Sequence, residues 1–363
     1  MARPTLRGLA GELGLSVGTV SRALNGYPDI SAATRERVRE AADRVGYDPD
    51  PIARRLATGS AETVAYLMPA SGGSLAYTFM AELLDGLSDT LARHGWDLLL
   101  VRDPLIGGSP GGSIAALERL ARSRRVSGVV LSRPHRSDAR VEALRRADLP
   151  FVLHGRTADH DDYAWFDVDG HRAMVDAIDH LVGLGHARIG FIGGPSHYNF
   201  ANERMEGYRA GLAANGLAFE DRLVRVAELS DAGGESAASD LLDGAEAPTA
   251  LLCVSDHVAL GALGAARARG IEAGRDLSVI GYDGLEAGRH AAPALTTMAQ
   301  PQADAGRAIG AMMLALAGGD DPRRHQILRR ATLLRRATDG PAPGRTPQAG
   351  TPPGVTARLT ASS

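Results

Sequence analysis

A short stretch near the N-terminus carries polar side chains at the spacing of one helix face. Residues 13–25 read LGLSVGTVSRALN, which predicts a turn followed by a short helix. Val20 and Leu24 are four residues apart, so both can be buried on one side. The opposite side carries Val17, Gly18, Ser21, Arg22 and Asn25. A guanidinium, an amide, a hydroxyl and a small apolar group are the groups that contact base edges and phosphates in the major groove of DNA.

Different residues of this face are expected to play different parts. Arg22 is expected to contact a base, because arginine to guanine O6/N7 is the commonest specific pairing. Val17 is expected to meet a thymine methyl group. Gly18 has no side chain, so recognition at its position in the helix is expected to rely on DNA shape. Phosphate contacts position a protein without specifying sequence. They are expected from Thr5, Thr19, Ser21, Asn25, Ser31 and Thr34. Ser16, which can cap the helix, belongs to the same DNA-binding set.

Three helices are needed to position this face. Thr5 is a suitable N-cap for a first helix over residues 5–13, and a third helix is expected to begin near residues 31–34 and to end at Gly46. The first helix is expected to bury Leu6, Leu9, Ala10 and Leu13. The third is expected to bury Val38, Ala41, Ala42 and Val45. This pattern is a helix-turn-helix unit that is too small to bury much apolar surface.

A short segment after the third helix is predicted to fold only with a partner. Pro51 can occupy the first position of a helix over residues 51–58, with Asp50 as its cap. Two turns of helix are mostly unfolded in water by themselves. The segment is therefore a candidate switch.

From Glu62 onward, short apolar runs alternate with amphipathic helices. The expected strands are 63–68, 97–101, 128–131, 151–154, 188–192, 250–254 and 277–282. The expected helices are 79–94, 171–183, 201–215 and 257–269. This alternation predicts an α/β fold of parallel sheets with helices on both faces, arranged in two lobes. Ligands of such sheets bind beyond the carboxyl ends of the strands, here between the lobes.

The N-terminal segments together resemble the LacI family of bacterial transcription regulators. The resemblance rests on TLRGLAGELGLSVGTVSRALNG, ISAATRERVREAADRVGY and the segment ending IARRLATG, and it continues to about residue 338. It implies a homodimer that binds a palindromic operator and responds to a small, sugar-like effector. The resemblance also implies hinge helices that form on DNA and insert Leu56, with Ala53 beside it, into the minor groove. Asp50 departs from the family, which usually has Asn there.

The resemblance further implies a core like that of periplasmic sugar-binding proteins, with crossings between lobes near Asp167, Gln300 and Leu328. The expected divisions are a DNA-binding domain at 1–60, an N-lobe at 61–166 and 301–327, a C-lobe at 167–300 and 328–338, and a disordered tail at 339–363. The implied effector-binding residues are Phe79, Arg156, Asp169, Arg204, Ser255, Asp256 and Asp283. Five further aromatic residues lie in loops that could reach the cleft, and the sequence does not place them: Tyr77, Tyr163, Trp165, Tyr198 and Phe200.

Composition narrows the function classes. The chain has 363 residues with a formal net charge of −3, so any DNA contact must be local rather than spread over the surface. The single cysteine and the scattered histidines give no metal or cofactor motif. With no apolar run of about 18 residues and no signal peptide, a cytoplasmic protein without a membrane role is expected.

Two other function classes compete with a DNA-binding regulator. The lobes alone would suit a sugar solute-binding protein, but the DNA-binding headpiece and the missing signal peptide argue against it. An enzyme is less favoured still. G-x-S-x-G occurs twice, once between two helices and once with Pro110 after the serine, where the oxyanion hole needs a backbone N–H.

Overall fold

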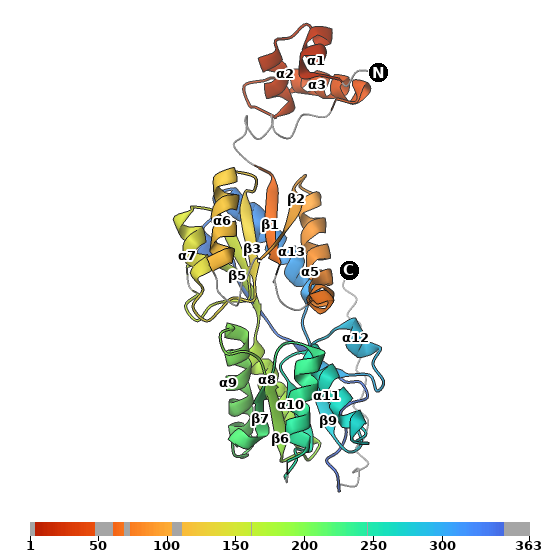
Figure 1. Cartoon of the computed structure of the whole chain (residues 1–363). Coiled ribbons are helices and arrows are strands. Elements are labelled where there is room, and N and C mark those ends of the chain that lie inside the picture. Colours follow the sequence, from red (N-terminus) through yellow and green to blue (C-terminus); the bar gives the residue numbers. More distant parts are fainter. Residues whose placement is uncertain are drawn as a thin grey trace, which may run out of the picture.

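The computed structural model describes residues 4–47, 61–68, 73–103, 111–160, 162–244 and 246–344. Within these ranges the chain forms a helical headpiece and two α/β lobes (Figure 1). The predicted hinge helix at 51–58, with Ala53 and Leu56, lies outside the described residues, as does the tail from residue 345.

The headpiece consists of α1 (Leu6–Leu13), α2 (Val17–Leu24) and α3 (Ala32–Val45), as the sequence predicts. Each begins at a hydroxyl cap: Thr5, Ser16 and Ser31 accept hydrogen bonds from backbone N–H groups three residues ahead. The buried core contains Leu9, Ala10, Val20, Ala23, Val38, Ala41 and Ala42. The prediction was wrong for Val45, which is 37% exposed. It is the last residue of α3, where the small core no longer covers the apolar stripe.

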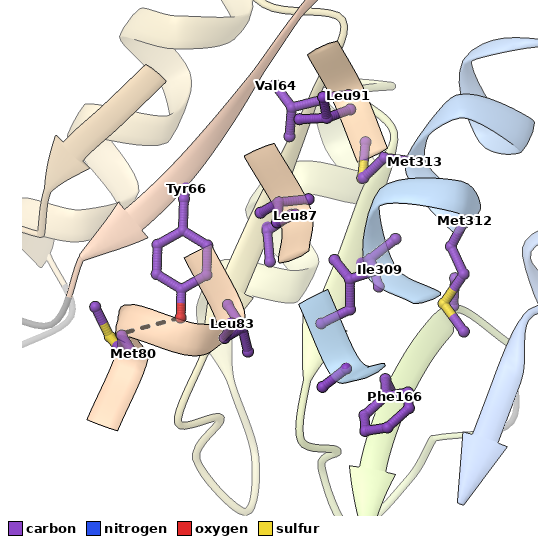
Figure 2. Close-up of a cluster of buried hydrophobic side chains, with 14 of the residues drawn as sticks. Val64, Tyr66, Met80, Leu83, Leu87, Leu91, Phe166, Ile309, Met312 and Met313 are labelled. Atoms are coloured by element: carbon purple, nitrogen blue, oxygen red, sulfur yellow. Dashed lines mark hydrogen bonds between the residues drawn. The ribbon is translucent and has the colours of Figure 1, made fainter. Parts of the chain in front are cut away.

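The N-lobe is a parallel six-stranded sheet in the order β11-β5-β4-β3-β1-β2, with helices on both faces. Its strands are β1 (Thr63–Met68), β2 (Asp97–Arg102), β3 (Gly128–Ser132), β4 (Phe151–His154), β5 (Ala164–Val168) and β11 (Gln326–Arg329). Its helices are α5 (Gly73–Ala92), α6 (Gly111–Ser123), α7 (Ala139–Arg146), α13 (Gln302–Ala317) and the 3-10 turn η2 (Pro322–Arg324). Figure 2 shows the cluster in which α5 and α13 pack on the β1 side chains Val64 and Tyr66.

Glycines allow α5 and α13 to cross closely. A Cβ on Gly86 would lie 2.4 Å from the carbonyl oxygen of Ala303, and a Cβ on Gly306 would lie 2.1 Å from that of Leu83. Such distances admit no side chain, so both positions require glycine. This pairing fixes α13, which follows the C-lobe in sequence, onto the N-lobe.

The C-lobe sheet has the order β12-β10-β9-β8-β6-β7, with only β12 antiparallel to its neighbour. Its strands are β6 (Ile189–Gly193), β7 (Val224–Val226), β8 (Ala250–Cys253), β9 (Ser278–Asp283), β10 (Thr296–Ala299) and β12 (Thr332–Leu334). Its helices are α8 (Gly170–Gly183), α9 (Asn199–Ala214), α10 (Asp231–Leu242), α11 (Asp256–Ala268), α12 (Glu286–Arg289) and the 3-10 turn η1 (Asp221–Leu223). The helices α8 and α9 cover one face of this sheet, and α10 and α11 cover the other.

The chain passes between the lobes three times: after β5, between β10 and α13, and between β11 and β12. β5 runs to Val168 and β11 to Arg329, so N-lobe structure extends past the expected ends at 166 and 327.

The prediction of a tail from Asp339 was wrong for its first residues. Asp339 is buried and accepts hydrogen bonds from His180 and Thr296, and Gly340 N donates to Ser278 Oγ at 3.0 Å. Polar bonds anchor this segment to the C-lobe, and its composition gives no sign of them.

Candidate functional site

The exposed face of α2 carries the side chains expected to contact DNA. Val17 is 42% exposed, Gly18 and Arg22 are also exposed, and Ser21 and Asn25 are half-buried. Asn25 Nδ2 donates to the carbonyl oxygen of Ser21 at 2.8 Å, which holds the amide against the end of the helix. The cap hydroxyls of Thr5, Ser16 and Ser31 also stay at the surface, and the Thr19 and Thr34 hydroxyls pair with Ser16 and Ser31.

Arg22 is held by residues of the loop after α2. Its guanidinium forms an ion pair with Asp29 and lies 5.5 Å from the ring centroid of Tyr27. Both partners are more than 40% exposed in this ion pair, so its net stabilisation is small, about 0–1 kcal/mol. Sequence reasoning missed Asp29, which brings a negative charge to a face expected to meet phosphates.

A cavity lies between the lobes, at the carboxyl ends of the strands of both sheets. Its N-lobe wall consists of Phe79, Met80, Ser132, Arg133, Pro134, His154, Gly155, Arg156 and Asp167. The opposite wall consists of Phe200, Arg204, Leu229, Ser255, His257, Asp283 and Gln300. Of the residues implied by the family resemblance, the structure brings Phe79, Arg156, Arg204, Ser255 and Asp283 to this cavity.

Arg204, on α9, is a buried charged residue of the C-lobe wall. It is 7% exposed, and its guanidinium carbon lies 3.6 Å from the ring centroid of Tyr282 and 4.8 Å from that of Phe200. Nη1 donates to the carbonyl oxygen of Val254, while Nε has no partner among the described residues. Aromatic stacking therefore fixes the guanidinium and leaves donor capacity toward the cavity.

Arg156 links the N-lobe to the C-lobe. Its Nε lies 3.0 Å from Asp167 Oδ2 in the crossing strand β5, and its Nη2 lies 3.0 Å from Glu203 Oε1 on α9. Burial, and then the nearby Glu203, raise the pKa of Asp167 to about 7 against the opposing effect of Arg156. Burial also raises the pKa of Glu203. The two carboxylates thus share one arginine, and burial favours the protonated form of each.

Asp283 ends β9 with its side chain at the cavity. Its backbone φ of 124° is in a region that favours glycine, and Gln300 Nε2 donates to its Oδ1 at 2.8 Å. Burial raises the pKa of its carboxyl group, while Arg204 and Gln300 oppose that shift. A strained backbone at a polar cavity residue is typical of functional positions.

Two carboxylates implied by the resemblance do not line the cavity. Asp256 is fully buried and accepts hydrogen bonds from Gly284 N at 3.0 Å, Leu285 N at 2.6 Å and Thr297 Oγ1 at 2.6 Å. Asp169 caps α8, accepting from Arg172 N at 2.8 Å. Both oxygens of the Asp256 carboxylate are occupied by internal bonds, so Asp256 supports the turn after Asp283 rather than facing a ligand.

The structure places four of the five aromatic residues that the sequence left unplaced. Of those described in full, only Phe200 lines the cavity. Tyr163 bonds to Thr157, Trp165 Nε1 donates to His160 O at 3.0 Å, and Tyr198 lies in the contact between the lobes. The side chain of Tyr77 lies outside the described part of the structure.

Sequence reasoning missed Ser132, Arg133, His154, His257 and Gln300 as cavity residues. Most of them end a strand or directly follow one, which is the position where ligands of such sheets bind. That rule, applied to every strand end, would have found Ser132, Arg133, His154 and Gln300.

The lobes also contact each other through their backbones beside the cavity. Arg136 N donates to His197 O at 3.0 Å, and Asn199 N donates to Pro134 O at 3.1 Å. His135 and Tyr198 form an antiparallel bridge there, and the His135 and His197 rings lie 5.1 Å apart. The structure therefore shows the two lobes hydrogen-bonded to each other.

Buried polar atoms without partners gather at this cavity. Within the described ranges they include Ser132 Oγ and Arg204 Nε on its walls and the Tyr282 hydroxyl beneath Arg204. Each such atom costs about 1–3 kcal/mol when left unpaired. Polar groups of a bound ligand would supply the missing partners. Among the described residues, no cluster of His, Cys, Asp and Glu could hold a metal ion.

Comparison with known proteins distinguishes the same two parts of the chain, the helical headpiece and the α/β body. Residues 5–50 match the family "Bacterial regulatory proteins, lacI family", and residues 178–338 match "Periplasmic binding protein-like domain". The chain is 39% identical to the HTH-type transcriptional regulator AglR of Rhizobium meliloti (strain 1021), over 94% of this chain and 96% of that protein. In the part of the chain that the structure describes, no helix is long and apolar enough to cross a membrane.

Solved structures agree with this match. The chain resembles a transcriptional regulator CelR–cellobiose complex with a TM-score of 0.70 and 30% identity, covering 93% of this chain and 100% of that one. It resembles the Lac repressor dimer bound to operator and the anti-inducer ONPF with a TM-score of 0.78 and 25% identity, again covering 93% and 100%. The chain therefore belongs to the LacI family and is a DNA-binding transcriptional regulator.

Proposed function

We propose that this regulator is a homodimeric repressor that binds a palindromic operator and is controlled by a sugar bound between its lobes. The observation that carries the sugar proposal is the composition of the cavity. Phe79 from one lobe and Phe200 from the other provide apolar faces, while arginine, aspartate, serine and glutamine side chains surround them. Aromatic faces pack against sugar C–H groups, and paired Arg and Asp side chains bind hydroxyls.

In this proposal Arg204 and Asp283 bind effector hydroxyls from the C-lobe, with Ser255 beside them. Arg156 and Phe79 contact the effector from the N-lobe. A ligand that touches both lobes favours the closed arrangement by its difference in affinity for the closed and open states. Because the chain crosses between the lobes three times, closure changes how the N-lobes of a dimer present their headpieces, which couples sugar to operator.

On the DNA side, we propose that the α2 face reads the half-site. Arg22 contacts a base and Val17 a thymine methyl, while Thr5, Ser16, Thr19, Ser21, Asn25, Ser31 and Thr34 contact the backbone and Gly18 leaves room for shape readout. Leu56, with Ala53, enters the minor groove at the operator centre. Two-fold symmetry of the dimer requires a two-fold symmetric operator.

The test is operator binding by the full chain, measured by fluorescence anisotropy on duplexes from upstream of its own gene. We expect specific binding that weakens steeply with salt and changes by at least tenfold with one of a panel of neutral sugars. Equal binding to operator and scrambled DNA would refute the proposed DNA role. Specific binding that no sugar changes would refute the proposed effector class.

A further inference from the structure

We propose that Arg133 and His154 form an effector subsite on the N-lobe wall, which binds two adjacent hydroxyl groups of a neutral sugar. The inference rests on the proposed function, because it concerns the same cavity. It adds two residues that are not among those implied by the family resemblance. Both lie at strand ends: Arg133 directly follows β3, and His154 is the last residue of β4.

Arg133 is the one cavity arginine whose guanidinium forms no hydrogen bond or ion pair with the described residues, although its positive charge acts on the nearby Asp283. Arg156 contacts Asp167 and Glu203, and Arg204 is bonded to Val254 O and stacked on aromatic rings. The segments that follow β1 and β2 in sequence, 69–72 and 104–110, contain no Asp or Glu. Arg133 therefore keeps its donors for something that enters the cavity.

The backbone of Arg133 is held in a conformation that a side chain rarely adopts. Its φ is 49°, in the left-handed region. Arg140 Nη2 donates to its carbonyl oxygen at 3.3 Å, and Arg140 is itself fixed by Asp138 Oδ2 at 2.7 Å. This nearly fully buried ion pair offsets a strain of about 1–3 kcal/mol. A strained residue anchored in this way is prearranged to present its side chain.

His154 lies beside it with a neutral imidazole. Its Cα pairs with that of Ser132 across β3 and β4, and its ring stacks on Phe79 with centroids 6.2 Å apart. Among the described residues, none hydrogen-bonds to its ring nitrogens. Burial and the charge of Arg133 lower the pKa of His154 to about 4. At pH 7 the ring therefore offers one N–H donor and one lone pair.

The combination fits hydroxyl groups better than an anion. Arginine has only donors, whereas a hydroxyl group must also give its own proton to an acceptor. The lone pair of His154 supplies that acceptor next to the Arg133 donors. A phosphate or carboxylate has no proton for this lone pair, and Asp167 and Asp283 in the same cavity oppose a further negative charge.

The test uses the full-length protein with an inducing or co-repressing neutral sugar and its singly deoxygenated analogues. In the wild type, removal of one of the two hydroxyls should weaken binding about 10–100-fold by calorimetry. Arg133→Met should bind the parent sugar about 10–100-fold more weakly, and His154→Phe, which keeps the stacking, about 2–10-fold. Each variant should lose discrimination against one deoxy sugar, while His154→Gln should keep part of it.

Arg136→Met is the matched control, because Arg136 lies on the same loop, is exposed and does not line the cavity. Unchanged operator affinity and melting temperature show that each variant is folded. Variants that discriminate the deoxy sugars as the wild type does would overturn the subsite. A sugar acid or sugar phosphate that binds more tightly than its neutral parent, with the gain lost in Arg133→Met, would overturn the neutral class. If the wild type binds operator but no sugar of any kind, the proposed effector function itself fails.

Discussion

Replacing Arg204 by methionine should uncouple the regulator from its effector while leaving DNA binding intact. The guanidinium is 7% exposed, stacked between Tyr282 and Phe200, and keeps an unpartnered Nε. Methionine has a similar length and fills the same space, so the change removes charge and donors with little loss of packing. DNA contacts lie in the headpiece, which has its own core.

The size of the effect follows from the bonds that are lost. A hydrogen bond from a charged donor to a ligand contributes about 1.5–3 kcal/mol, so sugar binding should weaken roughly 10–150-fold. The carbonyl oxygen of Val254 also loses its charged donor, which costs the C-lobe about 1–3 kcal/mol of stability. This cost is below the usual 5–15 kcal/mol total, so the variant should fold.

The assay is sugar titration of the protein bound to a fluorescent operator duplex, alongside thermal melting. Arg209→Met is the control, since Arg209 is on the same helix and stacks on Phe219 at 4.4 Å outside the cavity. We expect the half-effective sugar concentration to rise at least tenfold for Arg204→Met and to stay unchanged for the control. An unchanged half-effective concentration in a folded Arg204→Met variant would refute this assignment.

Three further predictions concern the headpiece, the hinge and the lobe contact. Arg22→Ala should lose about 1–3 kcal/mol of discrimination at a single base pair in competition binding, and equal discrimination by both proteins would exclude the base contact. Leu56→Ala should reduce operator bending measured by energy transfer between labelled DNA ends, whereas equal bending would argue against an inserted leucine. The raised pKa of Asp167, about 7, means that stability present at low pH is lost as the pH rises through 7. Asp167→Asn should therefore flatten the fall in free energy of unfolding between about pH 4 and 7, and an equally steep fall in the variant would contradict this origin.

Local sequence alone determined the headpiece. Its three helices begin at Thr5, Ser16 and Ser31 as predicted, because an N-cap hydroxyl and the first turn are neighbours in the chain. The outward position of Arg22 follows from helix periodicity in the same way. The alternation of apolar runs and amphipathic helices also predicted the two-lobed α/β body. Short strands such as β7 and β12, with only three residues each, gave no such pattern.

The tertiary structure decided which polar groups remain open to a ligand. By sequence, Asp256 and Asp283 were both candidates, yet three donors from residues 284, 285 and 297 occupy Asp256 and leave Asp283 at the cavity. Arg133 and His154 stand at the ends of two predicted strands, but they meet only because β3 and β4 pair side by side. The order of neighbouring residues in the chain determines helix caps and helix faces. The partners of a buried polar group, in contrast, come from distant segments. Only the packed lobes therefore show which groups have no internal partner.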